Sequence, residues 1–560
     1  MRQTKKLWAA AAILSLTLSG AAFANADLNV IRQGAASDPV TFVSGSPRVL
    51  IVSDFYTYGT SPFPNEPSVD LWVSPNGFGS NVAIYLYLLD RDSGNETFLT
   101  LDTATGDLEA VGAMTPLFGT AGSPILVPTP DLSGGVSLFG NGSIFGDIPG
   151  LDTSTGSYAV IFELRNEAGN VISRDNAMFS YVDSVVVKGG TIGSETWSAN
   201  NAYLLADQVF VGGGSTLTIE PGTVVMGEAD SISSLGVLQG ATINADCTAV
   251  KPCRFTSSAA RPDRQTQDFG GIIINGFAPT NLGTSPPPEG EGNTGPYGGD
   301  NPADNSGTLD YVVIEYAGRL FNAEDELNCL ALQGVGTGTT LSNIQCIGGS
   351  DDGVEFFGGT ANASNLLLVN NEDDQLDWTS GWVGNVTNVC AVHSGSPAGG
   401  SSDSNNCIEA DNDSSDNDSL PRSNPTITNF ACVRGSGGQG APMGEGLLLR
   451  RGTGVDLNNA VISNVFIGED SDFAIDVDGD SSQALVGTDL TVDAVVDGVA
   501  AAAISNVPIG GVNAGNSFLS DGANFFQPQL APRSSGRGCT TRNNDWTTGL
   551  WVQNDWGQGN

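Results

Sequence analysis

The residues in this sequence that could do chemistry are carboxylates that recur at a fixed spacing. The stretch GGSDDGVEFFGG, residues 348–359, is followed by NNEDDQLDWTSG, residues 370–381. Three pairs of acidic residues are each 22 positions apart: Asp351 with Asp373, Asp352 with Asp374, and Glu355 with Asp377. The apolar residues between them repeat as well, so the pattern indicates a structural repeat that stacks like charges on one another.

Stacked carboxylates need something that relieves their repulsion. We expect Glu355, Asp377 and Glu409 to form one outward column, because the residue before each is apolar and faces inward. Two carboxylates about 5 Å apart repel by roughly 3–4 kcal/mol at an effective dielectric constant of about 20. Protonation relieves this repulsion, and Ca²⁺, which binds about 6–8 oxygen ligands, would relieve it more fully. The alternative is a solvated acidic face whose Asp and Asn side chains bond turn backbone.

A second candidate for Ca²⁺ is the alternating stretch Asp476-Val477-Asp478-Gly479-Asp480, which lacks the downstream Glu of an EF-hand. We expect Leu449 to interrupt the acidic column and Asp476 to resume it. The predicted metal ligands are Asp351, Asp352, Glu355, Asp373, Asp374, Asp377, Glu409, Asp476, Asp478 and Asp480.

These acids need an architecture that stacks successive repeats. The short strand SNIQCIGG, residues 342–349, recurs as SNLLLVNN, TNVCAVHS and TNFACVRG. We expect Asn343, Asn365 and Asn388 to lie on successive rungs. Short apolar strands between Gly, Asn and Asp turns predict an almost entirely β chain. Strands repeating at this period predict a parallel β-helix with rungs about 4.8 Å apart.

The fold class predicted for the whole chain is all-β. Residues 1–24 are predicted to be a signal peptide and 25–184 an antiparallel β-sandwich, with a hairpin around Gly169 and Asn170. Residues 185–530 are predicted to be a right-handed parallel β-helix (solenoid), and 531–560 a C-terminal cap or tail.

Export follows from the N-terminus, where Arg2, Lys5 and Lys6 precede an apolar run and small-x-small sites. We therefore expect a secreted or cell-surface protein, with the periplasm also open. No later apolar run is long enough to span a membrane. The chain has 21 Lys+Arg against 62 Asp+Glu, a net charge of −41, which disfavours nucleic acid and anionic lipid as partners.

The eight cysteines all lie between Cys247 and Cys539. An even number in an exported chain favours disulfides. Cys247 and Cys253 can close a short loop in CTAVKPC, and Cys329 with Cys346 is a second candidate pair. A single histidine and the absence of CxxC argue against a structural zinc site.

Several segments together resemble a widespread group of exported bacterial right-handed β-helix proteins. They are LTIEPGTVV, KPCRFTS, FGGIIINGFAPTN, ALQGVGTGTTLSNIQCIGGSDDGVEFFGG and the terminal NNDWTTGLW. The resemblance runs from about Val185 to Trp551 and leaves the predicted sandwich outside. It implies the coil of pectate lyases and polygalacturonases, in a group whose members mostly have no established activity.

Two functions are open. The first is a non-enzymatic secreted or cell-surface protein, stabilised by Ca²⁺, that binds glycan, matrix or another surface component.

The alternative is a Ca²⁺-dependent polysaccharide lyase or glycoside hydrolase that acts on an acidic polysaccharide. It would use either the arginine base that the pectate lyase resemblance implies or paired carboxylates. Its catalytic residues would be Asp377, Glu409, Arg450 and Arg451. Exposed aromatic residues such as Trp378 would then line a cleft. The single His393 departs from the Gly-His-Gly of polygalacturonases. The sequence favours the non-enzymatic function.

Overall fold

The computed structural model describes the coil almost throughout and the N-terminal region in part. The described residues are 29–30, 40–41, 49–53, 56–57, 69–73, 83–102, 107–124, 136–139, 156–229, 231–259, 264–322, 325–393, 406–434, 445–463, 474–497 and 538–539. The predicted signal peptide and most of the predicted C-terminal tail lie outside them.

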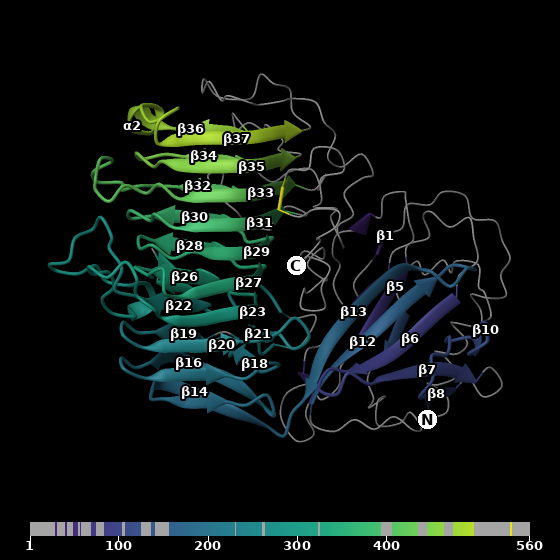
Figure 1. Ribbon diagram of the computed structural model, residues 1–560. Helices are drawn as coiled ribbons and strands as arrows, with labels where there is room; N and C mark the ends of the chain where they lie inside the picture. Colours follow the sequence, from purple (N-terminus) through teal and green to yellow (C-terminus); the bar gives the residue numbers. More distant parts are fainter. Residues whose placement is uncertain are drawn as a thin grey trace.

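The N-terminal region contains two sheets that face each other (Figure 1). One has the strand order β11-β5-β3, with β3 at Val49–Ser53, β5 at Val69–Val73 and β11 at Val136–Phe139. The other has the order β4-β13-β12-β6-β7-β8. Its strands are β4 (Tyr56–Thr57), β6 (Ala83–Asp90), β7 (Glu96–Asp102), β8 (Asp107–Val111), β12 (Gly156–Arg165) and β13 (Val171–Tyr181). Strand β3 contacts β12 and β13, which agrees with the predicted sandwich.

Two of these strands form the predicted hairpin. Strands β12 and β13 pair antiparallel over their whole length. The turn between them is closed by Asn166, whose side chain accepts hydrogen bonds from the backbone of Ala168 and Asn170. Three short two-stranded sheets stand outside the main ones. They are β1 (Asn29–Val30) with β2 (Val40–Thr41), β9 (Gly119–Thr120) with β10 (Ser123–Pro124), and β24 (Leu320–Asn322) with β25 (Asp325–Glu326).

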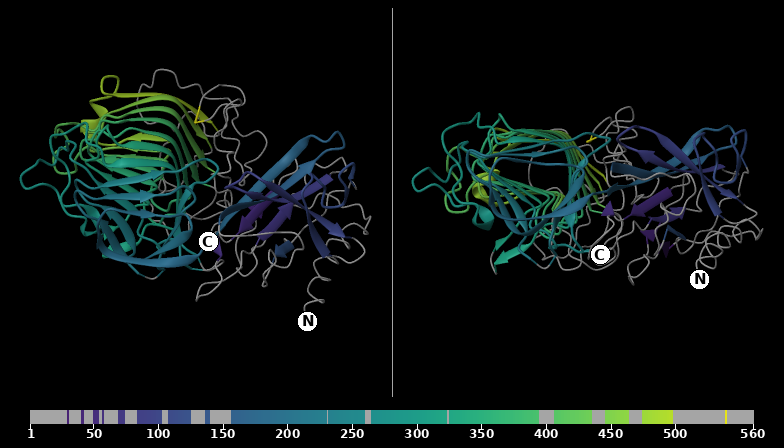
Figure 2. Two further views of the ribbon diagram at one scale, coloured as in Figure 1. Left: turned by 60° about the horizontal axis from the view of Figure 1, so that its bottom comes forward. Right: turned by 90° about the horizontal axis from the view of Figure 1, so that it is seen from below.

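From Ser184 onward the chain winds into a coil of stacked rungs. Within the described residues, 22 strands belong to it, and every pairing between rungs is parallel. Figure 1 shows the rungs from the side, and Figure 2 (right) looks along the axis of the coil. This arrangement confirms the predicted all-β fold with a parallel β-helix.

Three parallel sheets form the walls of the coil. In the lower rungs, the first sheet contains β15 (Glu195–Trp197), β17 (Thr216–Ile219) and β20 (Thr242–Asp246). The second contains β18 (Val224–Gly227) and β21 (Cys253–Ser257). The third contains β19 (Ser234–Val237), β22 (Ile272–Asn275), β26 (Leu330–Gln333), β28 (Val354–Phe357), β30 (Leu376–Thr379), β32 (Ile408–Ala410), β34 (Leu447–Leu449) and β36 (Ile475–Val477).

Longer strands connect these walls. β14 (Ser184–Ile192) and β16 (Asn201–Val211) span the second and third sheets. In later rungs one strand forms both the first and the second sheet. These strands are β23 (Gly307–Glu315), β27 (Thr340–Ile347), β29 (Ala363–Val369), β31 (Asn385–His393), β33 (Thr426–Arg434), β35 (Val455–Ser463) and β37 (Leu490–Asp497).

A single residue with positive φ bends most of these long strands. Asn343, Asn365 and Asn388 have φ between 52° and 61°, a conformation that Asn tolerates better than most residues. They lie on successive rungs, as predicted. Each donates its side-chain N–H to the side-chain oxygen one rung below, at 2.9 Å for Asn365 to Asn343 and 2.8 Å for Asn388 to Asn365. This asparagine ladder continues upward through Asn429 and Asn459.

The interior of the coil is apolar, and its largest fully buried side chains are Trp197, Trp378 and Trp382. The ring of Trp382 stacks on Phe356 with centroids 3.8 Å apart. Trp378 donates its indole N–H to Thr453 at 3.0 Å. The expectation that Trp378 lines an external cleft is therefore wrong, because it follows the outward Asp377 and faces the core.

Three disulfides cross-link the described residues. The predicted Cys247–Cys253 bond is confirmed, with its Cα atoms 5.8 Å apart. Cys390 is bonded to Cys539, and Cys407 to Cys432. The second candidate pair is wrong: Cys329 and Cys346 are both buried free thiols. They are neighbours in the core, where burial and a hydrogen bond to Cys346 raise the pKa of Cys329.

Candidate functional site

The acidic column stands on the outer face of the third sheet. Glu355 of β28 is in register with Asp377 of β30, and Asp377 with Glu409 of β32. The preceding residues, Val354 and Leu376, are buried in the core. Alternation along each strand therefore turns the carboxylates outward, as the spacing indicates.

The column contains three consecutive acids within the described rungs. Below Glu355 stands Ala331, and above Glu409 stands Leu448, followed by Asp476. The interrupting residue is thus Leu448, not the predicted Leu449, which is fully buried. The insertions between rungs shift the repeat by one position here, so counting along the sequence misplaced it.

The second predicted metal stretch does not form one cluster. Asp476 belongs to β36, whereas Asp478 precedes the short helix α2 (Gly479–Gln483) and Asp480 lies in its first turn. Both Asp478 and Asp480 are exposed. Neither candidate metal cluster among the described residues includes these three acids.

Asp352 and Asp374 belong to a second stack, in which each side chain accepts a backbone N–H from the next rung. Asn328 Oδ1 accepts from Asp352 at 3.1 Å, Asp352 Oδ1 from Asp374 at 2.9 Å, and Asp374 Oδ1 from Asn406 at 2.7 Å. The sequence predicted both residues as metal ligands, with backbone bonding by Asp and Asn only as the alternative. The signal for the backbone role is an Asn or Asp two residues before the first inward residue of four successive third-sheet strands, β26, β28, β30 and β32.

Burial dominates the electrostatics of these acids. Glu355 is 9% exposed, Asp352 4% and Asp374 1%. Burial raises the pKa of each well above its usual value, and neighbouring carboxylates raise it further. The same two causes raise the pKa of Asp377. For Glu355 this is partly opposed by Asn328, whose Nδ2 donates to Glu355 Oε2 at 2.6 Å.

In each of two groups of acids, the carboxylate oxygens lie close enough together to bind one cation. Asp352, Glu355 and Asp377 form one group, and Asp351, Asp352 and Asp373 the other; within each, the ligand atoms lie within 4.8 Å of one another. Oxygens bound to one Ca²⁺ at about 2.3–2.6 Å cannot be more than about 5 Å apart. Both groups satisfy this limit, and Asp352 belongs to both.

The upper end of the column is paired with arginines. Arg450 bonds Glu409, and its Nε donates to Asp411 Oδ1 at 3.0 Å. Arg451 also bonds Asp411. Burial raises the pKa of Glu409 to about 7 against the opposing effect of Arg450. The structure thus brings Glu409, Arg450 and Arg451 together as predicted. Asp411 was missed, although it stands two residues after Glu409, directly beyond the end of β32.

An apolar surface adjoins the lower end. Phe357 follows Glu355 by two residues and so faces outward beside it. Together with Phe321 it packs on the buried side chains of Ile273, Leu327 and Ala331, and both rings remain partly exposed. The outward aromatic residue of this face is therefore Phe357 rather than Trp378.

The three stacked parallel sheets and the outward acids define the class of the molecule as a parallel β-helix. A family model described as a pectate-lyase like beta helix domain matches residues 190–552. The chain belongs to this family, which confirms the predicted resemblance to parallel β-helix proteins. Neither a curated protein nor a solved structure shows significant similarity to the chain. Within the described residues, no helix has the length and apolar character needed to cross a membrane.

Proposed function

We propose that the protein is an exported, non-enzymatic binding protein that holds Ca²⁺ on its acidic column and binds an acidic polysaccharide through the bound ion. The observation that carries the proposal is the cluster of Asp352, Glu355 and Asp377, whose ligand atoms lie within 4.8 Å of one another. The side chains of Asp352 and Glu355 are largely buried on the outer side of the third sheet. Membership of the pectate-lyase-like family fits a polysaccharide-related role.

Ca²⁺ suits this cluster because the cluster offers only oxygen atoms, at the separations that the ion requires. Each pair of carboxylates this close repels by about 3 kcal/mol at an effective dielectric constant of about 20. A bound divalent cation turns that repulsion into attraction. One carboxylate oxygen of Asp352 accepts a hydrogen bond from the backbone N–H of Asp374. This bond fixes the direction of the Asp352 carboxylate, and the second oxygen can bind the ion.

The arginines favour binding over catalysis. A base that removes a proton from a sugar needs a pKa near the working pH. Burial alone would lower the pKa of Arg450, but the carboxylates of Glu409 and Asp411 outweigh burial and raise it. Ion pairing therefore holds the proton on Arg450 and directs its guanidinium at the protein's own acids.

A polysaccharide ligand is favoured by the surroundings of the cluster. With a net charge of −41, the protein repels a polyanion, so bridging cations would be needed for a uronic acid polymer to approach. Phe357 offers a partly exposed ring beside Glu355 on which a sugar ring could stack. The bound ion would hold the carboxylate of a uronic acid, and the aromatic ring next to it would pack against the sugar ring.

Calorimetric titration tests the two parts in turn. Wild-type protein should bind Ca²⁺, and Asp373→Asn combined with Asp377→Asn, which removes one ligand from each group, should lose that binding. Asp456→Asn is the matched control, because Asp456 is an exposed acid on another wall, where it accepts a hydrogen bond from Thr491. Polygalacturonate should then bind only in the presence of Ca²⁺, and Phe357→Ala should weaken polysaccharide binding about tenfold without changing Ca²⁺ binding.

Product analysis in the same samples separates binding from catalysis. Lyase activity would release unsaturated uronic acids that absorb ultraviolet light, and hydrolase activity would release reducing ends. We expect neither. Turnover that requires Ca²⁺ and is abolished by Arg450→Lys would overturn the non-enzymatic proposal in favour of the lyase. Failure of the wild type to bind Ca²⁺ would remove the proposal altogether.

A further inference from the structure

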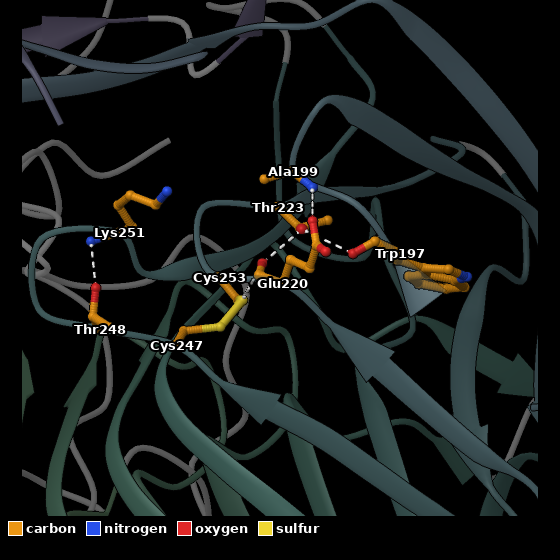
Figure 3. Close-up of a disulfide and its surroundings, with 8 residues drawn as sticks. All are labelled: Trp197, Ala199, Glu220, Thr223, Cys247, Thr248, Lys251 and Cys253. Atoms are coloured by element: carbon orange, nitrogen blue, oxygen red, sulfur yellow. Dashed lines mark hydrogen bonds between the residues drawn. A yellow bond between two sulfur atoms is a disulfide. The ribbon is translucent and has the colours of Figure 1, made fainter. Parts of the chain in front are cut away.

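The loop closed by the Cys247–Cys253 disulfide projects from the coil between β20 and β21. Figure 3 shows the disulfide and its surroundings. A turn inside the loop is closed from both ends, because Thr248 and Lys251 exchange backbone hydrogen bonds of 3.0 and 3.2 Å. The N–H of Lys251 also reaches the Thr248 hydroxyl at 3.0 Å. The loop is thus held in one shape by a covalent bond and by these hydrogen bonds.

The loop packs on neighbouring rungs, where the Cys247 N–H donates to the Asp310 carbonyl at 3.0 Å, and it also contacts the sandwich. Arg91, in the turn after β6, donates its Nε–H to the carbonyl oxygen of Val250. Lys251 forms an ion pair with Asp92 of the same turn. The two contacts join adjacent residues of the turn, Arg91 and Asp92, to adjacent residues of the loop, Val250 and Lys251. Together they fix both the position and the orientation of the loop relative to the turn.

The turn that receives the loop is itself well supported. Asp92 Oδ2 accepts the backbone N–H of Ser157 at 2.8 Å, and the N–H of Arg91 donates to the Ser157 carbonyl at 2.8 Å. Ser157 in turn lies against Gly222 of the coil, where a methyl group added to the glycine would come within 2.7 Å of the serine hydroxyl. A second close contact between the two domains therefore stands next to the first.

Arg91 is buried where the turn of the sandwich meets the loop of the coil. Only 6% of Arg91 is exposed, although it stands at a hairpin turn, where arginine side chains are ordinarily solvated. Nearby, the outer face of the second sheet presents a buried apolar cluster of Ala202, Leu204, Val224 and Met226, together with Val182 of the segment between the domains. Val182 directly follows β13, so this cluster anchors the end of the sandwich to the coil.

We propose that the disulfide-closed loop 247–253 is a docking surface whose partner is the chain's own sandwich, through the turn at Arg91 and Asp92. The disulfide holds the loop in the receiving shape before the domains meet, which lowers the entropy lost on docking. The sandwich and the lower rungs then move as one body. This docking does not depend on the proposed function.

Hydrogen exchange of the full chain, followed by mass spectrometry, tests the docking. Lys251→Met and Asp92→Asn should each speed exchange of the turn amides at residues 92–95 by roughly 2- to 5-fold, and the double variant should add little more. Lys188→Met is the control, since Lys188 pairs at 2.7 Å with Glu195 inside the coil. It should leave that turn unchanged.

The disulfide is tested by replacing Cys247 and Cys253 together with Ser. Exchange should rise by at least about tenfold in the loop and in the turn of the sandwich, and remain unchanged in β31–β35. Replacing Cys407 and Cys432 with Ser, which removes a disulfide elsewhere in the coil, should spare the turn. Unchanged exchange of residues 92–95 in both Lys251→Met and the Cys247/Cys253 variant would overturn the proposal. The Lys251 arm decides the question even if the cysteine variant does not fold.

Discussion

The asparagine ladder and the acidic column are both single-file stacks of polar side chains on the same coil, yet their chemistry differs. An amide donates and accepts, so Asn365 can bond both Asn343 below and Asn388 above. A carboxylate only accepts, so Glu355 and Asp377 cannot bond each other without a proton or a cation between them. A stack of amides satisfies its own hydrogen bonds, whereas each acid needs a proton, a cation or a donor from elsewhere, as Glu409 has in Arg450 and Glu355 in Asn328.

Removing Ca²⁺ should have the largest effect. At about 100 times its dissociation constant, the ion should add about 2.7 kcal/mol to the free energy of unfolding for each site. Chelation at fixed ionic strength should therefore lower the melting temperature of the wild type. The double variant Asp373→Asn, Asp377→Asn, which lacks one ligand of each group, should melt at one temperature in either condition, and in chelator it should be more stable than the wild type. Identical melting of the wild type with chelator and with Ca²⁺ would reduce the column to a solvated acidic face.

Converting one amide of the ladder into an acid should cost about 2 kcal/mol. Asn388→Asp keeps a residue that tolerates the φ of 61°, but it loses the donor that satisfies Asn365 Oδ1. Urea denaturation measures the loss. Asn385→Asp, an exposed position on the same strand, should change stability by about 0.5 kcal/mol or less. Equal effects at the two positions would show that the ladder contributes nothing beyond its backbone.

Stability without Ca²⁺ should fall as the pH rises. The pKa of Glu409 is raised from 4.5 to about 7, so the folded state retains a proton that the unfolded chain has already lost. The contribution is fully present below pH 4.5 and is lost as the pH rises to about 7, at a slope of at most about 1.4 kcal/mol per pH unit. Denaturation in chelator at several pH values should show a shallower slope for Glu409→Gln. An unchanged slope would assign the pH dependence to other groups.

The smallest effect is expected at the acids near α2. Asp478 and Asp480 are exposed and belong to neither candidate cluster among the described residues. Asp478→Asn and Asp480→Asn should therefore alter stability by about 0.5 kcal/mol or less and leave the effect of Ca²⁺ on melting intact. A loss of Ca²⁺ dependence in either variant would instead place an ion at this end of the coil.

The period of 22 residues was enough to predict the coil, the stacking of Asn343 with Asn365, and the register of Glu355 with Asp377, because a repeat without insertions fixes geometry through spacing alone. The alternation that turned Asp377 outward also required Trp378 to face inward, so that error was avoidable. The shift from Leu449 to Leu448 was not, since insertions separate Glu409 from the next rung.

Other features had no local signal. The Cys390–Cys539 bond joins residues 149 positions apart, and only the folded coil brings them together. The pairing of Arg450 with Asp411 likewise depends on how a long insertion returns to the stack. The backbone role of Asp352 and Asp374 was hidden because the same residue type serves equally as a metal ligand and as a hydrogen-bond acceptor.

The asparagine ladder also has a direction. Every side-chain N–H points down the coil and every side-chain oxygen points up, so the amide dipoles align head to tail, as peptide dipoles do in a helix. The positive end meets a carboxylate: Asn343 donates to Asp310 Oδ1 at 2.7 Å. Asp310 therefore acts as a counter-charge at the lower end of the ladder, while the upper end at Asn459 lies beneath β37, whose Val492 and Ala494 pair with Leu457 and Ala460. A rung inserted within the ladder with an asparagine at the same position would lengthen the row of dipoles, whereas a rung without one, inserted between Asp310 and Asn343, would separate the ladder from its anchoring charge.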